Sequence, residues 1–192
     1  MVAAFVQAEI DSARFSKPYR EGLRYLGVGR GGLIDTPDLS NENANEGRRF
    51  LLRGVRGYGI EQFLFRGWPG DIEWWRFTVS LDELKDFKYA HHQTWIDFTK
   101  GTRLVGDGAA NVDVVPAGEN TNANIKAVAA RSRNGTRFPE LIVLAQQKDG
   151  PFVLMEGHTR ATAYILAGAP EPVDCLLGLS PHMNSWFYWG TP

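Results

Sequence analysis

Cysteine is nearly missing from this sequence, with Cys175 the only thiol among 192 residues. One cysteine cannot form a disulfide bond within the chain, and it cannot build a metal centre from thiolates. The chain therefore has to fold without internal disulfide cross-links, and the scarcity of cysteine favours a reducing compartment.

Long hydrophobic runs are also missing. No apolar stretch approaches the roughly 18 residues that a membrane-spanning helix requires. The first residues, MVAAFVQAEIDSARF, contain neither the basic start nor the long apolar stretch of a signal peptide. We therefore expect a cytoplasmic protein with no membrane partner.

An excess of either charge is absent as well, because 21 basic and 22 acidic residues leave a net charge of −1. Duplex nucleic-acid binding usually relies on clustered Lys and Arg, so the overall charge gives it no support. A local basic group remains around Phe50, where a predicted strand would place Arg49 and Arg53 on one face. Such a face suits single-stranded nucleic acid, although a solvated sheet surface is the favoured interpretation.

The sequence does contain enough apolar material for a core, since 43% of its residues are hydrophobic. The charged fraction of 22% is ordinary for a globular protein, so disorder is not indicated. A length of 192 residues suits one domain with a sizeable extension. We assign residues 1–70 to an N-terminal extension or an elaboration of the same domain, and residues 71–192 to the main domain.

The N-terminal part of the chain is expected to combine helices, loops and short strands. The patterns predict, in order, a helix over residues 12–26, a polar loop over 36–47, strands at 50–55, 62–66 and 73–79, a helix over 81–90 and a long loop over 102–120. The second helix should begin with a capping box, because Ser80 and Glu83 can each bond the other's backbone amide.

The C-terminal part has a more regular pattern. It predicts a helix over residues 124–132, a hairpin of strands at 141–145 and 152–155, a helix over 159–167 and a strand at 173–177. Gly168 suits the left-handed end of the last helix, and Pro170 and Pro172 stop its continuation. The expected fold class is therefore α+β, a small mixed sheet with helices.

The string with the clearest chemistry is Glu156-Gly157-His158-Thr159-Arg160, where a predicted buried strand turns directly into a helix. Gly157 permits a sharp turn and the close approach of a ligand. The first helical amides point outward and carry the positive end of the helix dipole, which makes a candidate anion site. Arg160 adds a forked guanidinium that matches two phosphate oxygens. The same residues also suit a structural turn, with Thr159 as a cap and Arg160 as a surface charge.

This arrangement resembles the ParB/sulfiredoxin superfamily. In that superfamily a strand ends in a Gly-x-x-Arg turn that opens a helix of small residues, as the string GHTRATA does from Gly157. A helix, a glycine and a Pro-containing strand precede the turn, as Gly135 and the string FPELIV do here. The resemblance covers about residues 122–180. It implies that residues 71–192 contain a ParB/sulfiredoxin-like unit.

The resemblance also implies a nucleotide site. In ParB proteins the turn is similar to a cradle for CTP bound with magnesium, and in the free-serine kinases of the superfamily it reads Asp-Gly-His-His-Arg. By this likeness Gly157, Thr159 and Arg160 would bind the phosphates of a nucleoside triphosphate or diphosphate. Glu156 would help to hold Mg²⁺ and, together with His158, would be catalytic.

The expected protein is thus a nucleotide- or phosphate-binding ParB-like protein, and Mg²⁺-dependent phosphoryl transfer or nucleotide hydrolysis is its expected reaction. Glu140 is the candidate for the further general base that the kinases use. Sulfiredoxin chemistry is disfavoured, because His158 stands where sulfiredoxins carry their essential cysteine and Cys175 suits a core position. The helix-turn-helix segment that follows the ParB motif is missing, which disfavours a role in chromosome partition.

Two other classes of function stay open. One is a nucleic-acid-binding or nuclease-like module without nucleotide chemistry, and the other is a structural or interaction protein. A second copy of the chain, forming a homodimer, is a further partner to consider.

Two further strings have weaker interpretations. The run from Gly27 to Gly32 matches GxGxxG, but a dinucleotide fingerprint needs a strand before it and a helix after it, so a flexible turn is favoured. His91 and His92 lack a partner at metal-ligand spacing, and a polar helix end is the preferred explanation.

Overall fold

The structure is a computed structural model that describes residues 1–118 and 121–190. The chain divides into two compact units, Met1–Trp68 (unit 1) and Pro69–Pro192 (unit 2), and each is described by itself. None of the helices in the described residues is both long enough and apolar enough to cross a membrane.

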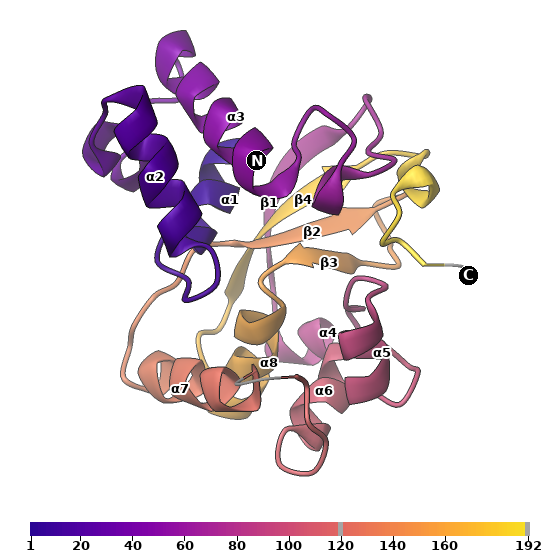
Figure 1. The fold of residues 1–192 in the computed structure, drawn as a ribbon. Helices are drawn as coiled ribbons and strands as arrows, with labels where there is room; N and C mark the ends of the chain where they lie inside the picture. Colours follow the sequence, from indigo (N-terminus) through magenta and orange to yellow (C-terminus); the bar gives the residue numbers. More distant parts are fainter. Residues whose placement is uncertain (119–120, 191–192) are drawn as a thin grey trace. The chain divides into compact units, whose positions relative to one another are not determined.

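Unit 1 is built from helices around a small aromatic and aliphatic core (Figure 1). Its elements are the α-helices α1 (Val2–Glu9), α2 (Ser16–Leu26) and α3 (Glu42–Arg56), the π-helix η1 (Gly31–Asp35) and the 3-10 helix η2 (Phe63–Phe65). The helix expected over residues 12–26 is present as α2, which begins four residues later than expected, at Ser16, and is capped by Gly27 in the left-handed conformation. Phe5, Leu52 and Phe65 are fully buried in the core of this unit.

The two strands expected within unit 1 are wrong. Residues 50–55 lie inside α3, and residues 62–66 contain η2. The polar loop expected over residues 36–47 ends early, because α3 already begins at Glu42. A short apolar run is compatible with a buried strand and with one side of a helix. The spacing of the buried residues identifies a helix over residues 50–55.

Helix α3 shows that spacing clearly. Its buried residues are Arg48, Leu51 and Leu52, and the two leucines follow Arg48 by three and four positions, so that all three share one side of the helix. Asn41 caps its start, since its side chain accepts a hydrogen bond from the amide of Ala44. The local capping signal and the helical period together outweigh the aliphatic composition.

The basic group around Phe50 is consequently different from the one expected. Arg49 and Arg53 still lie on one side of α3, because residues four apart are neighbours on a helix. Arg49 forms ion pairs with Glu42 at 3.0 Å and with Glu46 at 3.2 Å. These carboxylates offset its charge, and the strand face proposed for single-stranded nucleic acid is not formed.

Unit 2 contains a four-stranded mixed sheet in the order β1-β4-β2-β3. The strands are β1 (Glu73–Val79), β2 (Leu141–Ala145), β3 (Val153–Glu156) and β4 (Val173–Leu179). Strand β1 pairs antiparallel with β4, β4 pairs parallel with β2, and β2 pairs antiparallel with β3. The strands expected in this part of the chain, including the hairpin, are confirmed.

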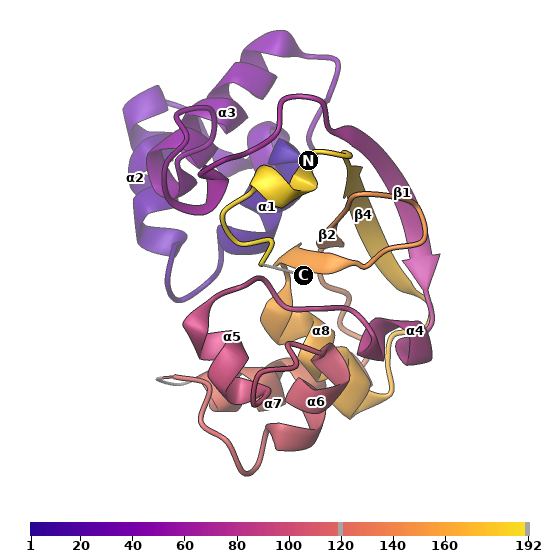
Figure 2. The same ribbon diagram turned by 90° about the vertical axis from the view of Figure 1, so that its right-hand side faces the viewer.

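The helices of unit 2 gather on one side of this sheet, as Figures 1 and 2 show. They are α4 (Leu81–Lys85), α5 (Gln93–Phe98), α6 (Val105–Asn111), α7 (Thr121–Arg133) and α8 (His158–Ala167), and the 3-10 helix η3 (Met183–Ser185) follows β4. The helices expected over residues 124–132 and 159–167 are confirmed as α7 and α8. Gly168 ends α8 in the left-handed conformation, as expected.

The expected capping box is present at the start of α4, where the Ser80 and Glu83 side chains each bond the other's backbone amide. The helix itself is shorter than the predicted 81–90. The chain leaves it to run beside the sheet, where the Lys88 amide donates to the Phe152 carbonyl at 2.8 Å. Hydrogen bonding to the sheet therefore replaces the last helical turn.

The long loop expected over residues 102–120 is partly wrong, because it contains α6. Val105 and Ala109 are buried and lie four residues apart, which gives this Gly- and Asp-rich helix an apolar side. The side-chain amide of Asn111 donates to the Phe98 carbonyl at 2.8 Å and fixes the helix end. Residues 119–120 of the predicted loop lie outside the described residues.

The core of unit 2 lies between the sheet and these helices. Leu141, Val143 and Ala145 alternate along β2 and contribute one side, and Ala161 and Tyr164 of α8 contribute the other. The protein thus has an α+β fold with a small mixed sheet. The sheet and α8 share this core, so the turn that joins β3 to α8 is held on both sides.

Substitution of two glycines by alanine should change the free energy of unfolding in opposite directions. We expect Gly54→Ala to stabilise the protein by about 1 kcal/mol, because Gly54 lies within α3 and an added Cβ meets open space. Gly178→Ala should destabilise it by about 1–3 kcal/mol, because its Cβ would lie 2.9 Å from both Leu144 and Trp74. Urea unfolding of both variants measures the difference, and equal effects would contradict the packing described for β4.

Candidate phosphate site at the turn after β3

The candidate site is the turn between β3 and α8. Strand β3 pairs with β2 so that Glu156 lies opposite Ile142, and α8 begins two residues later at His158. Gly157 stands between them with φ 100° and ψ 16°, in the left-handed region. The expected order of strand, glycine and helix is therefore present.

Gly157 cannot be replaced without strain. A Cβ atom at this position would lie 2.5 Å from Cδ2 of Leu141 and 3.2 Å from a terminal nitrogen of Arg160. Its positive φ also disfavours any side chain. Packing against β2 thus explains this glycine without a ligand.

Arg160 is not the solvated charge that a structural turn would suggest. Only 7% of its surface is exposed, and its guanidinium donates to the Glu156 carboxylate and to the carbonyls of Pro139 and Glu140. These contacts connect the first turn of α8 to the chain just before β2. Arg160 therefore has a structural role in this turn, and a phosphate would have to share it or displace Glu156.

Glu140 lies beside this cluster but uses its carboxylate elsewhere. Its Oε1 atom accepts from Nε of Arg76 at 2.7 Å, in a pair whose arginine is exposed. Its carbonyl accepts from Arg160 at 3.3 Å. The structure thus brings Glu140 and Glu156 to the same end of the sheet, as their proximity in the predicted sheet suggested.

His158 is held by a different part of unit 2. Its Nε2 atom accepts a hydrogen bond from the Ala90 amide at 3.2 Å, so the neutral ring carries its proton on Nδ1. The imidazole lies nearly parallel to Trp95, with ring centroids 5.0 Å apart, and to Tyr89 at 5.8 Å. Residues two apart on a helix do not face each other, and His158 and Arg160 accordingly have separate partners.

Behind His158 lies a buried hydrogen-bonded pair. The Tyr89 hydroxyl and the Thr162 hydroxyl are 2.5 Å apart, and Thr162 donates to the His158 carbonyl at 2.8 Å. Burial raises the pKa of the Tyr89 phenol above its usual range, so this group stays protonated at neutral pH. The pair fixes the first turn of α8 from inside.

The first turn of α8 has the properties of an anion site. No side chain caps its N-terminus, where Gly157 occupies the cap position. The early amides of an uncapped helix carry partial positive charge and point along the axis. Thr159, whose side chain is half-buried, contributes a hydroxyl at the same position.

A metal ion would find few preassembled ligands here. Within residues 1–118 and 121–190, no group of three or more His, Cys, Asp or Glu side chains is placed to hold one. Magnesium bound through nucleotide phosphates needs only one or two carboxylates, since water supplies its other ligands. Glu156 fits that requirement only if it exchanges its partner Arg160 for the ion.

The remaining candidates have structural explanations. Cys175 is buried, and burial raises the pKa of its thiol to about 12, so it is no nucleophile at neutral pH. His92 caps the start of α5 by accepting from the Thr94 amide, which corrects the expectation of a helix C-terminal end. The run from Gly27 follows the helix α2, so no strand precedes its GxGxxG pattern.

Sequence reasoning missed the aromatic side of the site. Trp95 and Tyr89 lie far from the turn along the chain, and neither belongs to a motif that would connect them with His158. Comparison of the chain with family models, curated proteins and solved structures finds no match. The resemblance to the ParB/sulfiredoxin superfamily therefore stays a prediction, and so do the roles assigned to residues 156–160.

The buried ion pair can be tested without any ligand. We expect Glu156→Gln to destabilise the protein by about 3 kcal/mol in urea unfolding, because Arg160 would lose its carboxylate partner in a buried setting. Glu140→Gln is the matched control and should cost less than about 1 kcal/mol, since it affects only the pair with the exposed Arg76. Equal losses for the two variants would contradict the structural role of Arg160.

Proposed function

We propose that unit 2 binds the phosphates of a nucleotide at the N-terminus of α8. The observation that carries the proposal is the uncapped first turn of this helix, which follows a left-handed glycine directly after a buried strand. Oriented amides in such a turn bind phosphate oxygens without further preparation. The likeness of this turn to that of the ParB/sulfiredoxin superfamily supports the same choice of ligand.

Residue roles follow from the contacts around the turn. The amides of the first turn and the Thr159 hydroxyl would bind phosphate oxygens. A phosphate that reaches Arg160 would compete with Glu156 for the guanidinium, because both are anions. Release of Glu156 would then provide the carboxylate for Mg²⁺.

His158 is the candidate for proton transfer. Its Nε2 atom accepts a hydrogen bond from the Ala90 amide, and an imidazole can transfer a proton near neutral pH. Stacking against Trp95 restrains the ring. The proposed reaction is transfer of a phosphoryl group or hydrolysis of the nucleotide, with magnesium supplying charge neutralisation at the phosphates when it is bound.

Introduction of a negative charge at Thr159 tests the proposal. The purified protein would be melted with ATP, ADP, CTP and GTP, each with and without magnesium. A ligand that binds only the folded state adds about 2.7 kcal/mol of stability when its free concentration is about 100 times its Kd. We therefore expect one of these nucleotides to raise the Tm of the protein. Thr159→Glu should abolish this shift while stabilising the free protein by about 0.5 kcal/mol, because a carboxylate favours the helix N-terminus but repels phosphate.

Thr159→Gln is the matched control, since glutamine has nearly the same shape as glutamate but carries no charge. It should lose only part of the shift, through loss of the hydroxyl. This design avoids substitution of Arg160, whose loss would destabilise the fold whether or not it binds phosphate. A nucleotide that stabilises Thr159→Glu as well as the parent protein would overturn the proposed site.

A further inference from the structure

Unit 1 contains a cavity that none of the preceding assignments uses. It is open to solvent and has a volume of about 770 Å³ between the end of α2, the π-helix η1 and the N-terminal half of α3. This volume lies within the range of roughly 300–1,000 Å³ that is typical of small-molecule sites. Its apolar lining comes from Leu26, Val28, Leu33, Ala44 and Phe50. The cavity is thus large enough and apolar enough for an organic ligand.

The charges that line the cavity have a single sign. They are the carboxylates of Asp38 and Glu46, and no Lys or Arg belongs to the lining formed by the described residues. Glu46 has an ion pair with Arg49 at 3.2 Å on the outer side of α3. Asp38 accepts hydrogen bonds from the amide and the hydroxyl of Ser40, which keep the pKa of its carboxyl below the usual range. Asp38 is therefore negatively charged at neutral pH.

An exposed aromatic pair lies at the same place. Phe50, which lines the cavity, is 43% exposed and stacks on Tyr25, which is 80% exposed, with ring centroids 5.5 Å apart. Val28 in the lining is also exposed. Grouped exposed apolar residues indicate a binding surface. Aromatic faces next to carboxylates attract organic cations, because both present negative potential.

Hydrogen bonds of a buried arginine connect the walls of the cavity. Arg48 is 1% exposed, and its guanidinium donates to the carbonyls of Leu33, Gly32 and Asp38 and to the Asn45 side chain. All of these acceptors lie in or beside the lining. A buried arginine therefore holds η1 and the following turn against α3.

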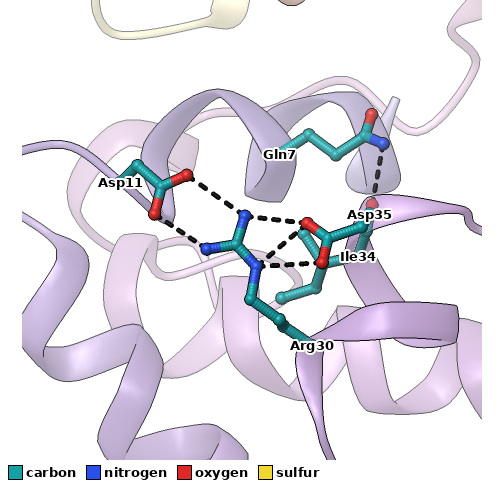
Figure 3. Close-up of polar contacts among 5 residues, drawn as sticks. All are labelled: Gln7, Asp11, Arg30, Ile34 and Asp35. Atoms are coloured by element: carbon teal, nitrogen blue, oxygen red, sulfur yellow. Dashed lines mark hydrogen bonds and ion pairs between the residues drawn. The ribbon is translucent and has the colours of Figure 1, made fainter.

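A second arginine holds η1 from its other side. Figure 3 shows Arg30 between Asp11 and Asp35, to which it donates at 2.8 Å and 2.7 Å, and Gln7 donating to the Ile34 carbonyl at 2.7 Å. These bonds attach η1 to α1 and to the segment that follows it. Pi-helical turns often occur at functional sites, and this one forms a wall of the cavity. A preformed cavity loses little free energy to ordering when a ligand binds.

We infer that unit 1 is a binding module for a small organic cation with an apolar body. The apolar body would lie against Leu33, Phe50 and the neighbouring lining, with its ammonium group facing Asp38. This inference concerns residues of unit 1 only and does not depend on the proposed nucleotide site.

Three probes with one ring system test the charge preference. Naphthylethylamine, naphthylethanol and naphthylacetate share an apolar body and differ in charge, and calorimetric titration of the full chain would measure the Kd of each. We expect the amine to bind about tenfold more tightly than the alcohol and the acetate to bind most weakly. In Asp38→Asn the amine should fall to the affinity of the alcohol, because that substitution removes only the charge.

Substitutions at two neighbouring glycines test whether the ligand binds in the cavity. Gly32 lines the cavity and Gly31 does not, although both belong to η1 and an added Cβ at either meets open space. Gly32→Leu should weaken the amine by about tenfold or more by occupying the cavity, whereas Gly31→Leu should leave its Kd within about twofold.

Methyl NMR shifts of Val28 and Leu33 on titration provide a measurement that needs no variant. Shifts at these methyl groups support the inference. Absence of amine binding, equal binding of the three probes, or shifts confined to methyl groups outside the cavity would each overturn it.

Discussion

The contact between Arg160 and Glu156 determines the geometry of the candidate site. Arg160 also donates to the carbonyls of Pro139 and Glu140, and these bonds attach the first turn of α8 to the residues just before β2. The close approach of these segments leaves no room for a side chain at Gly157. Because a buried charge that loses its partner is costly, this small network keeps β3, the turn and α8 in one arrangement.

Buried arginines stabilise irregular backbone segments in both units. Arg48 in unit 1 and Arg103 in unit 2 are nearly inaccessible, and their guanidinium groups donate chiefly to backbone carbonyls. Burial lowers the pKa of Arg103 from its usual value, because removal from water disfavours the charged form. The five donors of a guanidinium can satisfy several carbonyls of irregular segments at once. Irregular backbone next to both candidate sites is stabilised in this way.

The two candidate sites use different physical means of recognition. At α8, partial charges of oriented amides would attract a phosphate, and the neighbouring side chains already satisfy one another. In unit 1, an apolar cavity with Asp38 at its lining would select a cation. The ligands proposed for the two units therefore have opposite charge, and each proposal can fail without affecting the other.

The sequence by itself determined the α+β class, the four strands of unit 2, α7, α8 and the capping box at Ser80, because periodicity, glycine and capping residues act over a few neighbouring positions. It also located Gly157. Only the tertiary structure decided that Arg160 is buried beside the carbonyls of Pro139 and Glu140, and that Trp95 stacks on His158. These contacts join residues that are distant in the chain, and a single sequence carries no local signal for them.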